Sequence, residues 1–238
     1  MKPQNIDKNL EKDQIKSAAF DLRFLLDRGY RKKGALKFVA NRYLLNIKQK
    51  NYLVRTVFSR EKSMARKGKI VDITFINGKT LFVDGYNVLI TAESICSDNE
   101  RSVVVCDDGV LRDVNAVFGK YKYNEWTKTA LNQIITLLKL YNPLFVKFFY
   151  DSPVSRSGEL AKLTNRIINS HGVNGCAVTS KNVDFELKNL SKGSGNNDDS
   201  IRIVATSDGA IIDKVKNVLD IPNELCKLKE LKGKKILK

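Results

Sequence analysis

Aspartates follow the apolar, strand-like runs of this sequence at three separate places. Asp84 ends the run TLFV, Asp151 ends VKFFY, and Asp208 comes directly after IRIVATS. A carboxylate is among the most costly groups to bury, so its repeated position after a core strand needs an explanation. One explanation is structural, because aspartate is common in turns and as a helix N-cap. The other is that the three carboxylates form one site.

The carboxyl ends of parallel strands lie along one edge of a sheet, where α/β proteins bind their ligands. We therefore expect Asp84, Asp151 and Asp208 to converge there, and Asp184, near a predicted helix start, to face the same cleft. Like charges in one cleft raise one another's pKa. A divalent cation relieves that repulsion, and oxygen ligands favour Mg²⁺ or Mn²⁺. Such an ion suits the hydrolysis of a phosphodiester.

The elements that must position these carboxylates alternate between strands and helices over residues 70–226. This alternation predicts an α/β fold with a mostly parallel sheet flanked by helices. The run RSVVVCDDGVLRD predicts an inserted β-hairpin near the first of these helices, with its turn at Asp107, Asp108 and Gly109. Residues 227–238 are expected to form a basic C-terminal tail.

A small helical domain is expected ahead of the sheet. Three runs of apolar residues at helical spacing occupy residues 15–58, and the polar run SREKSMARKGK reads as a linker. We expect residues 1–69 to form this basic three-helix domain and its linker. Its connection RGYRKKG resembles the turn of a helix-turn-helix.

Positive charge is concentrated at the two ends of the chain. The net charge is +16, and residues 1–69 carry 19 Lys and Arg against 6 Asp and Glu. Residues 227–238 add 6 Lys against 1 Glu, whereas the middle of the chain is slightly acidic. Such asymmetry indicates an anionic partner, RNA or another nucleic acid first, although a solvated basic face is the alternative. The candidate contacts are Arg28, Tyr30, Arg31, Lys32, Lys33 and Arg112, the last of which could pair with Asp113 instead.

Several protein classes are excluded or disfavoured. No run has the apolar length of a membrane span, the first residues lack a secretory h-region, and the four cysteines are scattered, so we expect a cytoplasmic protein with free thiols. The sequence argues against a P-loop, because NGKT precedes a strand and lacks the earlier glycine. No GxGxxG follows a strand, and Tyr86 occupies the place where a haloacid-dehalogenase-type phosphatase needs its second aspartate.

Four segments together resemble the PIN-like nuclease superfamily. They are FVDGYNVLI, FYDSPVSRSGELA, NVDFEL and VATSDGAIID, and the resemblance extends over residues 15–222. The most similar branch is an uncharacterised, mainly archaeal family with a helical N-terminal region. The DGYN and TSD segments are also similar to NYN-type and flap-endonuclease-like nucleases. The inserted hairpin and the lack of a fifth acid close after Asp208 depart from the superfamily pattern.

The resemblance implies a metal-dependent nuclease, most readily an endoribonuclease, whose basic ends hold RNA. It implies that Asp84, Asp151, Asp184 and Asp208 hold Mg²⁺ or Mn²⁺, and that Asn87 orients a ligand or the scissile phosphate. The alternative is a catalytically inactive RNA-binding or ribosome-associated protein on the same scaffold, since a fold of this kind can persist as a binding module. Glu93, two helical turns beyond Asp84, could point into the cleft or out to solvent.

Overall fold

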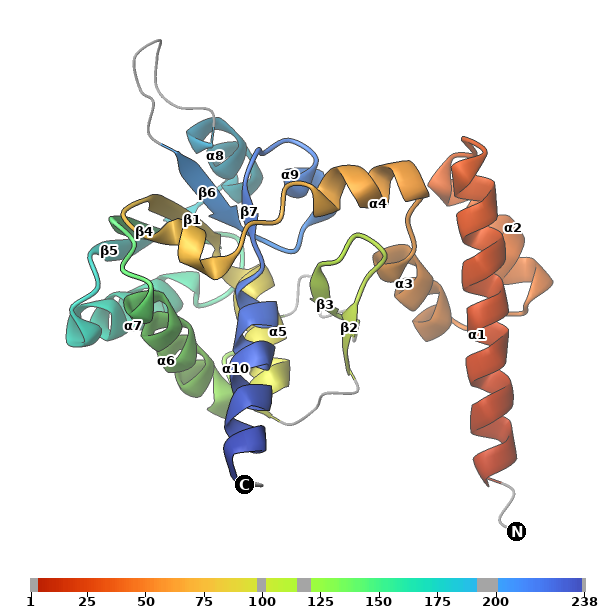
Figure 1. Ribbon diagram of the computed structural model, residues 1–238, viewed down its shortest axis with the longest axis horizontal. Helices are drawn as coiled ribbons and strands as arrows, with labels where there is room; N and C mark the ends of the chain where they lie inside the picture. Colours follow the sequence, from red (N-terminus) through yellow and green to blue (C-terminus); the bar gives the residue numbers. More distant parts are fainter. Residues whose placement is uncertain (1–3, 98–101, 115–120, 192–200, 237–238) are drawn as a thin grey trace. The chain divides into compact units, whose positions relative to one another are not determined.

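The computed structural model describes residues 4–97, 102–114, 121–191 and 201–236 (Figure 1). The chain divides into two compact units. The helical unit contains residues 1–67 and 104–116, and the sheet unit contains residues 68–103 and 117–238. Within the described ranges, no helix is both long enough and apolar enough to cross a membrane.

The described residues of the helical unit form four helices where the sequence predicts three. They are α1 (Gln4–Asp27), α2 (Lys32–Arg42), α3 (Ile47–Thr56) and α4 (Arg60–Lys67). The first three pack around an apolar core that includes Ala18, Leu22, Val39 and Leu53. The fourth occupies the predicted linker. Its sequence has no apolar stripe, so helical periodicity gives no signal for it.

The predicted hairpin forms, and it belongs to the helical unit. Strands β2 (Val103–Val105) and β3 (Leu111–Asp113) pair around a turn in which Gly109 adopts a φ of +80°. At one side of the turn, Arg23 donates two hydrogen bonds to Asp107, of 2.9 and 2.8 Å. The hairpin is therefore part of the basic unit, although it is inserted into the sequence of the sheet unit.

A fully buried carboxylate holds the hairpin turn in place. Asp108 accepts two hydrogen bonds from Arg112, of 2.6 and 2.8 Å, and one of 2.8 Å from Arg66 of α4. Both guanidinium groups lie over the ring of Phe58, that of Arg112 at 5.4 Å and that of Arg66 at 4.6 Å from the ring centroid. The pKa of Asp108 is lowered because the two guanidinium groups outweigh the effect of its burial.

The sheet unit contains a five-stranded parallel sheet in the order β5-β4-β1-β6-β7. This confirms the α/β fold with a mostly parallel sheet flanked by helices. The strands are β1 (Thr80–Asp84), β4 (Phe145–Asp151), β5 (Gly175–Ser180), β6 (Arg202–Ala205) and β7 (Val218–Leu219). A short 3₁₀ helix, η1 (Ile73–Ile76), precedes the first of them, where the sequence has a β-branched run.

Helices cover both faces of this sheet. One layer contains α5 (Gly85–Cys96), α6 (Glu125–Leu140), α7 (Ser157–His171) and α10 (Ile221–Ile236), which contact one another. The opposite face is contacted by α8 (Val183–Leu190), which also contacts the short α9 (Gly209–Ile212). The described part of the basic tail is therefore helical, because α10 continues through it.

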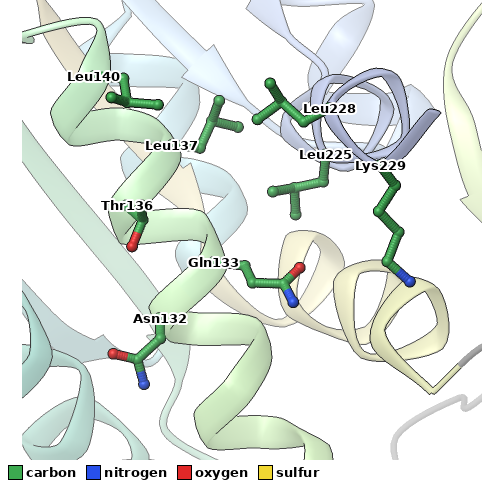
Figure 2. Close-up of a pocket in the computed structure, with 8 residues that line it drawn as sticks. All are labelled: Asn132, Gln133, Thr136, Leu137, Leu140, Leu225, Leu228 and Lys229. Carbon is green, nitrogen blue, oxygen red and sulfur yellow. The ribbon is translucent and has the colours of Figure 1, made fainter. Parts of the chain in front are cut away.

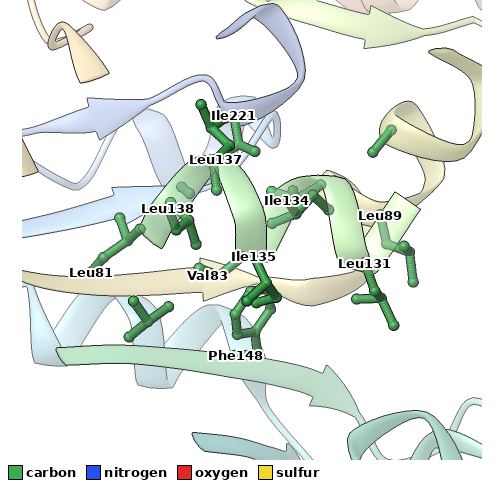
Figure 3. Close-up of a cluster of buried hydrophobic side chains, with 14 of the residues drawn as sticks. Leu81, Val83, Leu89, Leu131, Ile134, Ile135, Leu137, Leu138, Phe148 and Ile221 are labelled. Carbon is green, nitrogen blue, oxygen red and sulfur yellow. The ribbon is translucent and has the colours of Figure 1, made fainter. Parts of the chain in front are cut away.

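The main core lies between the sheet and the layer that contains α6. Leu81 and Val83 of β1, together with Phe148 of β4, meet Ile135 and Leu138 of α6, and all five are almost fully buried (Figure 3). Alternate residues of a strand point to opposite faces. The even-numbered residues of β1 and the odd-numbered residues of β4 therefore face α8, and these sets include Asp84 and Asp151.

The Asp108 cluster allows a direct test of what holds the helical unit together. We expect Asp108→Asn to lower the free energy of unfolding by about 3–5 kcal/mol, because it removes the buried negative charge that Asp108 presents to two buried guanidinium groups. Urea-induced unfolding of the full chain measures this loss. Asp13→Asn, at an exposed ion pair with Lys16, should change it by less than about 0.5 kcal/mol. A loss below 1 kcal/mol for Asp108→Asn would contradict the structural role of the cluster.

Candidate functional site at the carboxyl edge of the sheet

The central strand carries Asp84 at its carboxyl end. Strand β1 lies between β4 and β6, so Asp84 has a parallel strand on each side. The connection after β1 leads to the β4 side of the sheet, and the connection after β6 leads to the β7 side. The boundary between β1 and β6 is thus the topological switch point, and ligands of open α/β sheets bind outside the carboxyl ends of strands at such a point.

One oxygen of the Asp84 carboxyl group is held by two neighbours. Its Oδ2 accepts a hydrogen bond of 2.7 Å from Asn87 Nδ2 and another of 2.7 Å from Thr206 Oγ1. Thr206 in turn accepts a hydrogen bond of 3.0 Å from the backbone N–H of Asp208. Neither of these two hydrogen bonds to the Asp84 carboxyl group involves Oδ1. Asp84 is 2% exposed, so the two donors fix the position of a carboxyl group that is almost fully buried.

The predicted carboxylates are electrostatically coupled around Asp84. The pKa of Asp84 is raised to about 7, chiefly by burial and also by the negative charges on Asp208 and Asp151, while the two hydrogen bonds lower it. Burial likewise raises the pKa of Asp151, and the charge on Asp184 adds to this effect. All four carboxylates predicted from the sequence therefore lie within electrostatic reach of at least one other.

The four carboxylates differ in how they are held. Asp151 is half-buried, whereas Asp184, in the first turn of α8, is exposed and pairs with Lys188 at 3.4 Å. Asp208 caps α9, because its Oδ1 accepts a hydrogen bond of 2.5 Å from the backbone N–H of Ala210. The structural explanation offered by the sequence, a helix N-cap, thus applies to Asp208. It does not apply to Asp84, whose side chain makes no capping hydrogen bond to α5.

No compact metal cage is built from these groups. Among the described residues, no three His, Cys, Asp or Glu side chains lie close enough together to hold a metal ion. Mg²⁺ usually keeps several of its waters and uses only one or two carboxylates plus substrate phosphates. The oxygen-only donors at this edge fit that coordination, with Asp84 as the buried ligand and its coupled neighbours as further donors.

Close packing fixes the start of α5 behind Asp84. A Cβ atom at Gly85 would collide with the Tyr150 ring and lie 2.7 Å from the carbonyl oxygen of Phe149. The next residue, Tyr86, packs edge-on against Tyr150 at 5.2 Å and against Tyr121 at 5.1 Å. Its hydroxyl group is buried and has no hydrogen-bond partner in the described structure. Burial and the charge on Asp151 raise the pKa of Tyr86 to about 12, so the phenol is protonated at neutral pH.

Glu93 belongs to a separate, internal network. Its carboxylate accepts hydrogen bonds from Tyr121 Oη and Thr127 Oγ1, both 2.6 Å, and from Asn124 Nδ2 at 2.9 Å. Asn124 and Thr127 also form the capping box of α6. Glu93 thus connects α5 to the start of α6 and points neither to the acidic edge nor to solvent.

The predicted basic contacts of the helical unit divide into two kinds. Arg28, Tyr30, Arg31 and Lys33 are exposed around the turn between α1 and α2. Lys32 instead donates hydrogen bonds of 2.7 Å to the carbonyl oxygens of Val54 and Val57, and its pKa is lowered to about 8 by burial and then by nearby Arg66 and Arg112. Lys32 and Arg112 are used inside the fold.

A pocket of about 460 Å³ lies elsewhere on the sheet unit, between α6 and α10 (Figure 2). Leu137, Leu225 and Leu228 line it with an apolar surface, and none of the predicted site residues contributes to it. Its one charged lining residue is Lys229, whose ammonium group donates a hydrogen bond to the carbonyl oxygen of Ile95. The pocket is therefore not the place where the chemistry predicted from the carboxylates would occur.

Two residues at the acidic edge were missed by the sequence analysis. Thr206 stands one residue past β6, in the register that places it beside Asp84. Strand alternation could have found it, because it shares a face with Val204 and Asp84. Tyr86 stands inside the DGYN segment, but its burial between two other tyrosine rings depends on tertiary packing that no local pattern predicts.

The raised pKa of Asp84 predicts a particular dependence of stability on pH. Between about pH 4 and pH 7 the folded protein binds a proton at Asp84 that the unfolded chain has released, so stability should fall as pH rises through this window. Asp84→Asn should remove this contribution to the pH dependence of the free energy of unfolding. The contribution is about 1.4 kcal/mol for each unit by which the pKa of Asp84 is raised on folding. Urea-induced unfolding at pH 4.5 and pH 8 measures it, with Asp72→Asn, at an exposed aspartate bonded to Thr74, as the control. Parallel pH profiles for Asp84→Asn and wild type would contradict the assignment.

Comparison with known proteins places the chain in a family. Residues 73–224 match the family described as Domain of unknown function (DUF5616), and residues 14–69 match Protein of unknown function (DUF434). The protein named Uncharacterized protein MJ0935 from Methanocaldococcus jannaschii is 37% identical over 209 residues, which cover 87% of this chain and 94% of that protein. No solved structure matches the chain. Because the first match covers more than half of its residues, the chain belongs to the DUF5616 family.

Proposed function

We propose that this protein is a metal-dependent nuclease that hydrolyses phosphodiesters, most readily those of RNA, at the carboxyl edge of its sheet. The observation that carries the proposal is the Asp84 carboxyl group. It is buried at the topological switch point, held through one oxygen, and coupled to Asp151 and Asp208. A turn or a helix cap needs neither this burial nor this coupling.

Mg²⁺ or Mn²⁺ is the cofactor that fits these residues. Asp84 would hold the ion through its carboxyl group, with Asp151, Asp184 and Asp208 as further direct or water-mediated ligands. When bound, such an ion lowers the pKa of a coordinated water and stabilises the negative charge that develops on the phosphate. A cation also favours the ionised form of Asp84, which burial alone disfavours.

The surrounding residues would hold this carboxyl group and the substrate in position. Asn87 and Thr206 fix the rotamer of Asp84 through their two hydrogen bonds, and Thr206 ties this arrangement to the backbone of Asp208. The basic helical unit supplies charge that attracts the nucleic-acid backbone.

A cleavage assay tests the proposed activity. With Mn²⁺ or Mg²⁺, the purified protein should cut a mixed pool of RNA or DNA, and chelation with EDTA should abolish cleavage. Asp84→Asn should reduce the rate at least about 100-fold, because it removes the buried anionic ligand. Asp208→Asn should reduce it by a smaller factor, while Asp72→Asn should leave it within about twofold of wild type. If the wild type cuts neither polymer, or if Asp84→Asn cuts as well as wild type, the nuclease proposal is wrong.

One observation favours a second function. The lack of any three closely spaced metal-ligating side chains in the described ranges suits an inactive scaffold that binds RNA without a metal. The protein would then be an RNA-binding or ribosome-associated protein that keeps the fold and the basic ends.

Divalent-cation binding separates the two functions. We expect isothermal titration calorimetry to detect Mn²⁺ binding to the wild type, and we expect Asp84→Asn to weaken it at least about tenfold. Binding should release protons near pH 7, because the ion competes with the proton on Asp84. Tight RNA binding with no detectable Mn²⁺ binding would favour the inactive scaffold.

A further inference from the structure

One face of α1 carries two exposed aromatic rings with a cation at each end. Lys16, Phe20 and Phe24 follow one another at intervals of four residues, so they lie along one side of the helix, and Arg28 continues this spacing directly after the helix ends. Phe20 is 66% exposed and Phe24 is 49% exposed. The buried residues Ala18 and Leu22 occupy the opposite side of the helix and face the core. We call the four exposed residues the α1 stripe.

The α1 stripe is not explained by the packing of its own unit. Two phenylalanine rings on one helix face expose apolar surface that the core could have covered, and such patches commonly mark binding sites. The guanidinium group of Arg28 lies over the Phe24 ring, 4.3 Å from its centroid. This contact fixes a planar cation on a ring, and both groups offer flat faces to a further planar ligand.

Positive charge surrounds the stripe and continues past its end. The chain turns at Gly29, and beyond it Tyr30 is 59% exposed and is followed by the exposed cations Arg31 and Lys33. In the described part of the chain, none of Arg28, Arg31 and Lys33 takes part in an ion pair. Among the acids of α1 whose side chains are described, Asp13 pairs with Lys16 at the start of the stripe, and the other two have partners elsewhere. Asp21 accepts a hydrogen bond from Tyr43, and Asp27 accepts one from the backbone N–H of Arg60.

We propose that the α1 stripe and the turn after it bind single-stranded nucleic acid, with bases stacked on Phe20, Phe24 and Tyr30 and phosphates held by Arg28, Arg31 and Lys33. Proteins that bind single strands combine cations that follow the backbone with exposed aromatic rings on which bases stack. In a duplex the bases stay stacked on one another, so they expose much less base surface on which these rings could stack. The excess of unpaired cations favours a polyanion over a protein partner.

The proposal deepens the proposed function, because it specifies the substrate as single-stranded, and it rests on nucleic acid being a ligand of this protein. The two can nevertheless be separated. The stripe acts through binding alone, so its effect is measured in EDTA, where no metal-dependent cleavage takes place.

Fluorescence anisotropy with a labelled 12-nucleotide oligouridylate and the full chain provides the test. We expect Phe24→Ala and Phe20→Ala each to weaken binding about tenfold, because each removes a stacking surface. Phe24→Tyr should restore binding to within about twofold of wild type. Arg28→Gln should lower the slope of log affinity against log salt by about 0.7, the value for one phosphate on a single strand. The matched control is Phe38→Ala, since Phe38 is 64% exposed but lies on α2, outside the stripe.

Each outcome of these measurements supports or overturns the assignment. The assignment is supported if the wild type binds the oligouridylate more tightly than a duplex of equal length. This preference should be lost in the two stripe variants and kept in Phe38→Ala. Equal weakening by Phe38→Ala, equal affinity for the duplex, or unchanged binding in both stripe variants overturns it, and the exposed rings would then be assigned to a protein partner. If the stripe variants bind normally and the protein cleaves nucleic acid, the nuclease proposal holds and the stripe proposal fails. If binding depends on the stripe but no cleavage occurs, the stripe proposal holds and the nuclease proposal fails.

Discussion

The burial of one carboxyl group at the end of the central strand is the constraint on which the acidic edge depends. An apolar residue in place of Asp84 would have completed the core, because the three residues before it in the strand are buried. The fold instead surrounds it with two specific donors, Asn87 and Thr206. Burying a carboxyl group is costly unless hydrogen bonds compensate for it, and both described donors act on Oδ2. The retention of a carboxyl group at this costly position is the strongest indication in this structure that the edge does more than complete the core.

Much of this edge could be predicted from local sequence, because strand ends in parallel sheets are easy to recognise. Asp84 and Asp151 each follow a run of buried residues, and parallel strands place such residues at one edge whatever the loop lengths. The sequence could not predict which face each carboxylate takes, since a shift of one residue reverses the face. It also left open whether Asp208 caps a helix or serves the site. The structure gives it a capping bond and a tie to Thr206 at the same time.

The helical unit was harder to predict, because tertiary contacts override its local pattern. Residues 60–67 have no apolar periodicity, yet they form α4, which contributes Arg66 to the buried cluster around Asp108. The hairpin reads as an insertion in the sheet unit, and only its contacts assign it to the helical unit. Arg112 shows the consequence. Its position in a basic chain suggested a phosphate contact, whereas its pairing with Asp108, four residues earlier in the hairpin, holds it inside the fold. Net charge alone does not distinguish cations that meet a ligand from cations that neutralise the interior.

The same distinction decides what the remaining basic residues are for. Lys32, Arg66 and Arg112 surround Phe58 and balance Asp108 and two carbonyl groups, so their charges serve the helical unit. Arg28, Arg31 and Lys33 have no such internal acceptors in the described residues. Holding cations in mutual proximity costs free energy unless an anion is nearby, and this cost is smallest where the charges stay in water. Cations that remain exposed beside aromatic rings are therefore placed where a polyanion can approach them. The sheet edge has the opposite charge, which a divalent cation can offset.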